Sequence, residues 1–201
     1  FRLSFALIFF LLAALPLHAQ AENFGPCCMT SEWSQVTMSD EAWDGKGQAI
    51  LVVTNRPYQA DDPNGVVFPN KLAPFREVRY LHAVCREGNW TLHPTGNLTA
   101  GLESVHREGD LLLFVHGHGK SMPAVLARAK QIQEKYDISL LIFDWPSYNS
   151  NFNKSLSRVR RCGENFYNLL LQLGTYREER MGEGQHLSML LHSLGNSSVS
   201  H

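Results

Sequence analysis

The stretch Leu187-Ser188-Met189-Leu190-Leu191 leads directly into His192-Ser193-Leu194-Gly195-Asn196, and the rest of the chain is organised around it. A short, mostly apolar run that stops at a serine is typical of a strand ending in a sharp turn. In a nucleophile elbow, small residues on both sides of the serine let neighbouring backbones pass. Gly195 stands two residues after Ser193, but Leu191 stands two before it. The stretch therefore holds only the second half of a G-x-S-x-G motif, and its meaning depends on the other strands.

Two earlier apolar runs end in a similar way. Residues 111–115 stop at His116-Gly117-His118-Gly119, and residues 138–143 stop at Asp144-Trp145-Pro146. Ser121 is placed to cap a helix that runs to about residue 136. Apolar residues at helical spacing between 156 and 173 predict a second helix. Strand, helix, strand, helix, strand predicts an α/β fold with a mostly parallel sheet, flanking helices and right-handed crossovers.

The ends of these three strands are expected to meet. In open α/β sheets, ligands bind at the carboxyl ends of the strands. The turns 116–119, 144–147 and 192–196 should therefore lie side by side on one rim, which strengthens the half-motif at Ser193.

The first part of the chain is less regular. Residues 49–54 predict a buried strand, 58–75 a loop and 78–84 an antiparallel strand. The stretch 88–109 is polar and punctuated by Pro94, Gly96 and Gly101, and it predicts no regular element.

Composition limits the class of protein. The 201 residues carry a net charge of −1 and are 44% hydrophobic, which suits one globular domain with a substantial core. Near-neutral charge gives no support for nucleic-acid binding, which needs a basic face. No repeat or low-complexity tract is present.

The N-terminal residues have the features of a secretory signal peptide. Arg2 precedes an apolar stretch over 5–15, and Ala19-Gln20-Ala21 offers a cleavage site after Ala21 or after Ala19. A membrane anchor is the alternative, but the run is shorter than the ~20 residues that a spanning helix needs. We expect a signal peptide over 1–21, an irregular segment over 22–47 and one domain over 48–201. The mature protein would be periplasmic or extracellular, with no stable membrane span.

Four cysteines remain, Cys27, Cys28, Cys85 and Cys162. Export would place them where disulfides form, and four thiols allow three complete pairings. A bond between the neighbours Cys27 and Cys28 would be strained, so pairing with Cys85 or Cys162 is the easier arrangement. No cysteine sits in a glycine-framed turn, so none is the expected nucleophile.

Four short motifs, taken in order, resemble a known family. They are Thr54-Asn55-Arg56, Phe114-Val115-His116-Gly117, Trp145-Pro146-Ser147 and His192-Ser193-Leu194-Gly195-Asn196. Together they are similar to a bacterial branch of the α/β-hydrolases, esterase- or lipase-like and of unknown function, over residues 49–201. The chain departs from that pattern at Leu194, where Met is usual, and at Leu191, where Ala is usual.

The resemblance implies a serine hydrolase acting on a small-molecule ester or acyl substrate through a covalent intermediate on Ser193. The amides of Leu194 and His118 would form the oxyanion hole. The site rim would be formed by His116, Gly117, Asp144, Trp145 and Gly195. No cofactor is implied.

A metal site is an alternative use of the same rim, since His116, His118, His192 and Asp144 could converge there. Their spacing matches no standard zinc motif. His192 is not expected to be the base for Ser193, because adjacent side chains on a strand point to opposite faces. It is expected to pack or form a hydrogen bond beneath the elbow.

The triad partners of Ser193 are expected after it, because the order in this fold is Ser, then acid, then His. Residues 194–201 contain no acid, and His201 falls in the expected helix. We therefore expect an internal piece of a longer exported protein, with the hydrolase fold truncated after the elbow and inactive as a fragment. The rival hypothesis is a noncatalytic cell-envelope interaction protein on the same scaffold.

Overall fold

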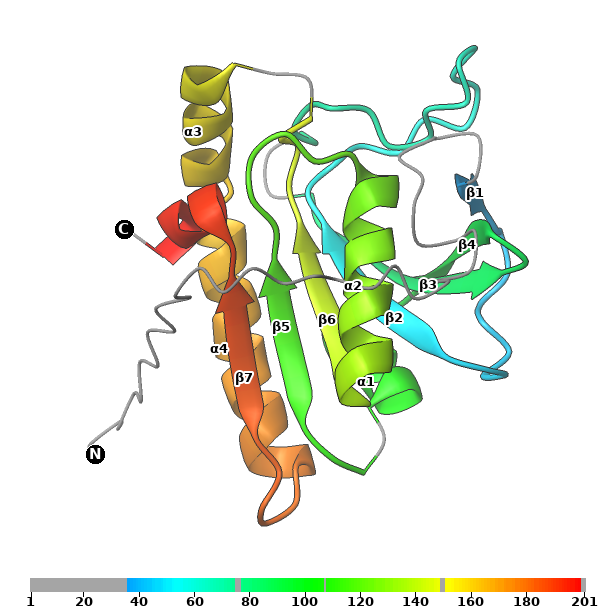
Figure 1. The fold of residues 1–201 in the computed structure, drawn as a ribbon, viewed down its shortest axis with the longest axis vertical. Helices are drawn as coiled ribbons and strands as arrows, with labels where there is room; N and C mark the ends of the chain where they lie inside the picture. The colour runs from blue at the N-terminus through cyan, green and yellow to red at the C-terminus, as the bar shows by residue number, and fades with distance from the viewer. Residues whose placement is uncertain (1–35, 75–76, 107, 149–150, 200–201) are drawn as a thin grey trace, which may run out of the picture.

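A computed structural model describes residues 36–74, 77–106, 108–148 and 151–199 (Figure 1). The proposed signal peptide over 1–21 lies outside these residues. Within them, the strands are β1 (Val36–Met38), β2 (Ala49–Thr54), β3 (Arg79–Arg86), β4 (Asn89–Thr95), β5 (Leu111–Val115), β6 (Ser139–Asp144) and β7 (Leu187–Leu191). The helices are α1 (Leu98–Val105), α2 (Met122–Tyr136), α3 (Phe152–Arg161), α4 (Gly163–Arg180) and the 3-10 helix η3 (Ser193–Val199).

The strands form one mostly parallel sheet in the order β1-β4-β3-β2-β6-β5-β7. β2, β6, β5 and β7 are mutually parallel, and the register pairs Thr54 with Asp144, Val115 with Phe143 and Val115 with Leu191. These pairings place the carboxyl ends of four strands at one level. The predicted α/β fold is confirmed, and the three turns follow strand ends that lie at one level.

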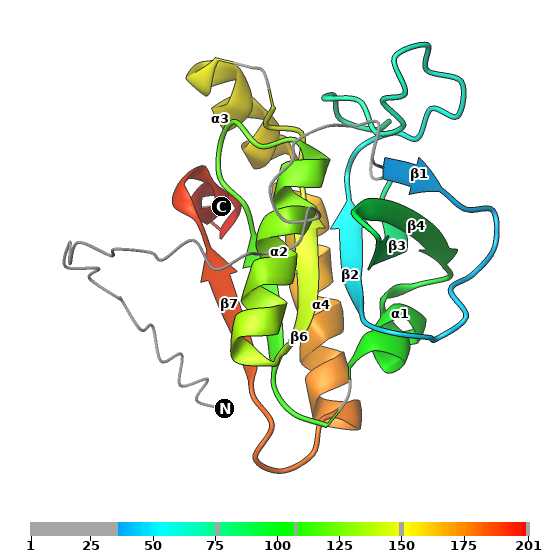
Figure 2. The ribbon, with the colours of Figure 1, turned by 45° about the vertical axis from the view of Figure 1, so that its right-hand side comes forward.

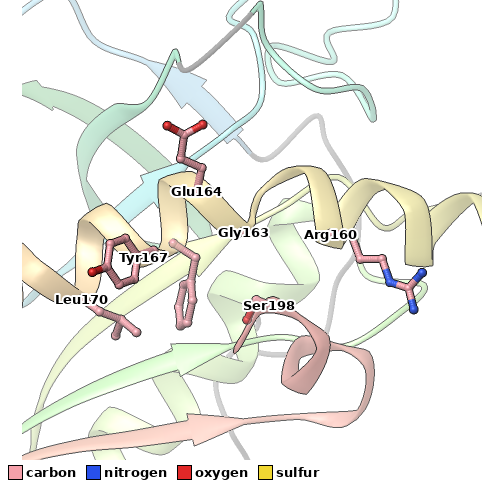
Figure 3. Close-up of a pocket in the computed structure, with 7 residues that line it drawn as sticks. Arg160, Gly163, Glu164, Tyr167, Leu170 and Ser198 are labelled. Carbon is pink, nitrogen blue, oxygen red and sulfur yellow. The ribbon is translucent and has the colours of Figure 1, made fainter. Parts of the chain in front are cut away.

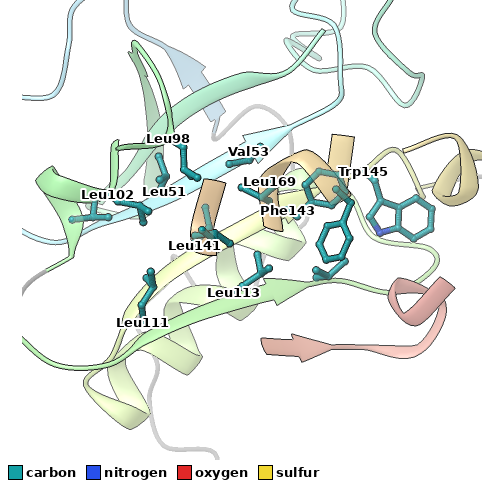
Figure 4. Packing of buried hydrophobic residues seen from close by; sticks show 14 of the residues in the cluster. Leu51, Val53, Leu98, Leu102, Leu111, Leu113, Leu141, Phe143, Trp145 and Leu169 are labelled. Carbon is teal, nitrogen blue, oxygen red and sulfur yellow. The ribbon is translucent and has the colours of Figure 1, made fainter. Parts of the chain in front are cut away.

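Helices cover both faces of this parallel half, as Figures 1 and 2 show. Alternate residues of the strands enter two separate cores. Leu51, Leu113 and Leu141 pack with α1 and α4, whereas Val52, Phe114 and Ile142 pack with α2. Figure 4 shows the first of these cores. β2, β5 and β6 are continuous apolar runs because both of their faces are covered.

The two predicted helices differ in outcome. α2 begins as expected, since the Ser121 side chain accepts a hydrogen bond from the Ala124 amide. The second prediction, one helix across 156–173, is wrong in detail: α3 and α4 are separate helices that meet at Cys162.

The antiparallel strand predicted over 78–84 is present as β3, which pairs with β2 and β4. The sequence did not indicate β4, α1 or the short strand β1, which lies in the segment expected to be irregular. In the sequence Gly101 looks like a loop residue, but in the structure it is a buried packing residue inside α1. A Cβ there would lie 2.7 Å from Leu51 Cδ1, so the missing side chain lets α1 pack closely on the Leu51 side chain of β2.

β7 is the outermost strand of the described sheet, with β5 as its neighbour. Met189 and Leu190 are 45% and 44% exposed, unlike the apolar residues of β5 and β6. No helix in the described part of the chain is long and apolar enough to span a membrane.

The two described cysteines differ in state. Cys85 is disulfide-bonded. Cys162 is free and buried at the α3–α4 junction. Burial, reinforced by the Asp144 charge, raises the pKa of the Cys162 thiol to about 12. A thiol held in this way is neutral and unreactive at neutral pH.

Candidate active site

Ser193 sits at a sharp turn between β7 and η3. Its backbone φ is +53°, a left-handed conformation that residues with side chains seldom adopt and that is common at active sites. The His192 amide donates to the Val115 carbonyl at 2.9 Å, which extends the pairing with β5 past the end of β7. The Gly195 amide then donates back to the His192 carbonyl at 2.9 Å. The serine side chain is left exposed, as in a nucleophile elbow.

Two glycines let the turn pack directly on the loop after β5. A Cβ at Gly195 would lie 2.9 Å from the His116 carbonyl oxygen and 3.0 Å from that of Val115. A Cβ at Gly117 would lie 2.7 Å from His192 Nδ1 and 2.9 Å from Ser193 Cβ. Gly195 therefore packs on the backbone of the loop after β5, and Gly117 packs on His192 and Ser193. Leu191, in the position where a small residue is usual, turns instead toward the core that α4 covers.

The two amides expected to form an oxyanion hole belong to segments that adjoin or contact Ser193. Leu194 follows the serine directly, and its side chain is anchored in the core. The His118 amide belongs to the peptide that begins at Gly117, which touches Ser193 Cβ. Within the described residues neither N–H has a hydrogen-bond acceptor, so both are available to a ligand. The His118 ring points elsewhere, with Nδ1 2.9 Å from Ser155 Oγ.

Beneath the turn lies a buried ion pair. Arg56 Nε donates to Asp144 Oδ2 at 2.7 Å, and both side chains are excluded from water. Thr54 Oγ1 also donates to Oδ2, at 2.7 Å. Burial alone would raise the pKa of Asp144, but the Arg56 charge and the hydrogen bonds from His116 and Arg56 outweigh it and lower the pKa to about 2. Asp144 is therefore a fixed anion and not a proton carrier.

His116 and Trp145 connect this ion pair to the turn. Their rings are stacked, with centroids 5.3 Å apart and planes inclined by 4°. Trp145 Nε1 donates to the His116 carbonyl at 2.9 Å, the same carbonyl that Gly195 approaches. His116 Nδ1 lies 2.9 Å from the Gly117 carbonyl oxygen, and Nε2 lies 3.3 Å from Asp144 Oδ1.

The structure thus separates the expected rim residues into two layers. Ser193 is exposed, and Gly117 and Gly195 form the close backbone contacts around it. His116, Asp144 and Trp145 lie below as a buried layer, not on an open rim. His192, expected to pack or form a hydrogen bond beneath the elbow, is exposed, with its Nδ1 close to Gly117. In the described ranges no three His, Cys, Asp or Glu side chains group as a metal site.

Sequence reasoning missed two residues that shape the site. Arg56 belongs to the motif Thr54-Asn55-Arg56, but its partner Asp144 lies 88 positions away, and no local sequence pattern indicates this pairing. Ser147 holds the loop after β5, because its hydroxyl accepts from the Lys120 amide at 3.0 Å and donates to the Lys120 carbonyl at 3.1 Å. Its place after Trp145-Pro146 was the available signal.

A hollow of about 470 Å³ lies between α4 and the far end of η3 (Figure 3). It is lined by Arg160, Glu164, Phe166, Tyr167, Leu170 and Ser198. Ser193 is not part of its wall, so this hollow does not mark the site of chemistry.

A mostly parallel sheet covered on both faces, with a strained serine at a strand end beside a His-Gly loop, defines the α/β-hydrolase class. The comparison with protein families agrees. The chain belongs to a family of α/β-hydrolases of unknown function (DUF900), whose model matches residues 96–201. No curated protein and no solved structure matches the chain.

Proposed function

We propose that this protein is an exported serine hydrolase that cleaves carboxylic esters through an acyl intermediate on Ser193. The observation that carries the proposal is the φ of +53° at Ser193, in a turn on which Gly117 and Gly195 allow close packing. Strain of this kind persists only where the surrounding structure enforces it, and here it leaves the Ser193 hydroxyl exposed. The amides of Leu194 and His118 have no acceptor among the residues that the structure describes.

The reaction follows the usual course for such a site. Ser193 Oγ attacks the ester carbonyl carbon while a general base takes its proton. The amides of Leu194 and His118 stabilise the negative charge on the carbonyl oxygen, the bond to the alcohol breaks, and the alcohol leaves with the proton. Water then repeats the attack on the acyl-serine and releases the acid. Triad order in this fold places the base and its acid partner after Ser193 in sequence.

A fluorophosphonate probe tests the nucleophile. The protein is expressed from its complete reading frame, so that any residues after position 201 are present, and labelling is located by peptide mass spectrometry. Labelling is expected at Ser193, and Ser193→Ala should abolish it. Ser188→Ala is the matched control, because this exposed serine lies on β7 and has no role in the turn.

Labelling that persists in folded Ser193→Ala would disprove the assignment. A folded wild-type protein that neither reacts with the probe nor hydrolyses esters would instead favour the noncatalytic cell-envelope protein.

Export rests on the basic start, apolar stretch and Ala19-Gln20-Ala21 of the sequence. The disulfide at Cys85 supports it, since such bonds form in oxidising compartments. The test is fractionation of bacteria that express the complete frame. A mature protein in the periplasm or medium, beginning at Glu22 or Gln20, is expected, and an uncleaved protein in the cytoplasm would contradict export.

A further inference from the structure

The His116 ring is held from several directions inside the protein. Trp145 stacks on its face, and Asp144 Oδ1 and the Trp145 amide lie 3.3 and 3.2 Å from Nε2. Nδ1 faces the Gly117 carbonyl oxygen at 2.9 Å. A carbonyl oxygen only accepts, so Nδ1 carries a proton in the neutral and in the charged ring alike. In the neutral ring, Nε2 accepts a hydrogen bond from the Trp145 amide. In the charged ring, Nε2 donates to Asp144.

The Gly117 carbonyl and the His118 amide belong to one planar peptide group. The peptide bonds of the described residues are all trans, so this C=O and this N–H point in opposite directions. A hydrogen bond from His116 to the carbonyl therefore fixes the direction of the His118 N–H. Gly117 packs on Ser193 Cβ, which places that peptide beside the nucleophile.

We infer that His116 is a positioning residue, which orients the Gly117–His118 peptide so that the His118 N–H faces the acyl group on Ser193. Asp144, Arg56 and Trp145 hold the His116 ring in place for this purpose. The inference rests on the proposed function of Ser193. His116 touches no reacting atom, so its effect passes through the peptide.

This arrangement explains why an ion pair is buried under a backbone loop. Glycine at 117 permits close packing on Ser193, but it also leaves the peptide plane free to rotate. A misplacement of about 1 Å at a reacting group can cost about 10²-fold in rate. Donation to the carbonyl also polarises the peptide and makes its N–H a stronger donor.

The test compares para-nitrophenyl acetate with its thiono analogue, in which sulfur replaces the carbonyl oxygen. Sulfur is a poor hydrogen-bond acceptor, so the preference for the oxygen ester reports on the oxyanion donors. His116→Asn keeps a donor at the position of Nδ1, whereas His116→Gln keeps one only at the position of Nε2. In the full-length protein, His116→Gln should lower kcat for the oxygen ester by about 10²-fold with little change in KM, and lower the ester-to-thionoester ratio by at least about tenfold. His116→Asn should retain most of both.

His106→Gln is the matched control, because this histidine bonds Tyr176 and Gly109 away from the turn. If both His116 variants fail to fold, Trp145→Phe is the second test, because it keeps a stacked ring and removes the hydrogen bond to the His116 carbonyl. We expect the ester-to-thionoester ratio to fall about threefold or more in this variant. An unchanged ratio in folded His116→Gln, equal losses in the Asn and Gln variants, or an unchanged ratio in Trp145→Phe would overturn the inference. A wild-type protein that the fluorophosphonate probe does not label at Ser193 would instead contradict the proposed function.

Discussion

Arg56 and Asp144 form a salt bridge of 2.7 Å from which water is excluded, and the register of β2 and β6 brings the two residues together. Removing one partner leaves the other as an uncompensated buried charge. Arg56→Met should therefore lower the free energy of unfolding by about 3–5 kcal/mol, measured by urea denaturation.

The control for this prediction is Arg86→Met, because Arg86 pairs with Asp44 at 3.7 Å on the exposed surface. Screening by solvent makes such a pair weak, so little change is expected. A loss at Arg56 no larger than the loss at Arg86 would show that the buried pair does not stabilise the fold.

Asp144 should make the protein sensitive to acid. Its pKa falls from an ordinary 3.8 to about 2 in the fold, so the folded state binds fewer protons than the unfolded chain in that range. The resulting stability is complete above the unfolded pKa and is lost as the pH falls from about 5 toward 2. Urea midpoints measured across this range should fall less steeply in Asp144→Asn, although that variant is less stable at neutral pH. Parallel curves for the two proteins would contradict the assignment.

His82 should add a second pH dependence nearer neutrality. It is buried against Trp43 with Nε2 3.0 Å from the Gly101 carbonyl, and burial lowers its pKa despite that hydrogen bond. The unfolded chain therefore takes up a proton at a higher pH than the folded protein. The stability from His82 is present above the unfolded pKa and decreases as the pH falls below it. His82→Gln should flatten the urea midpoint between about pH 7 and pH 5. His93 pairs with His82 across β3 and β4, and its charge also lowers the pKa of His82, so it cannot serve as the control. The control is His106→Gln, a histidine that contacts Tyr176 and Gly109 instead of His82, and it should leave the slope largely intact.

Gly117 should tolerate no side chain. An added methyl group would meet His192 and Ser193 at less than 3.0 Å, so Gly117→Ala should displace the turn and reduce fluorophosphonate labelling of Ser193 at least about tenfold. Gly174 provides the control, because nothing lies within 4 Å of a Cβ there. Gly174→Ala lies inside α4 and should stabilise the protein by about 0.5–1 kcal/mol with labelling unchanged. Full labelling of Gly117→Ala would mean that the close contact is dispensable.

Cys162 should resist modification in the folded protein. Its pKa near 12 and its burial leave almost no thiolate at neutral pH. Iodoacetamide at pH 8 should modify it only after unfolding in urea, as site-resolved mass spectrometry would reveal. Cys162→Ala should leave labelling of Ser193 intact. Rapid modification of the native thiol would show that the α3–α4 junction opens readily.

β2, β5 and β6 could be predicted because they are buried on both faces and their sequences are therefore unbroken apolar runs. β7 could be predicted from its apolar run as well, although it lies at the exposed edge of the described sheet. β4 and α1 could not, since Pro94 and Gly101 look like loop residues until the tertiary contacts of Gly101 are known. Ser193 was found from half a motif and the order of its neighbours. The pairing of Arg56 with Asp144 could not be predicted from the sequence, because the register of distant strands brings these two residues together.

The pairing of β7 with β5 has a consequence for how this site can vary. Side chains alternate across a strand, so a shift of one residue in that ladder would turn Ser193 toward the opposite face. The Val115–His192 hydrogen bond and the contact between Gly195 and the His116 carbonyl both oppose such a shift. An insertion or deletion within β7 would therefore remove the nucleophile from its setting even with every residue of the turn retained. Length changes in this protein should be tolerated in surface loops and excluded from the strand that delivers Ser193.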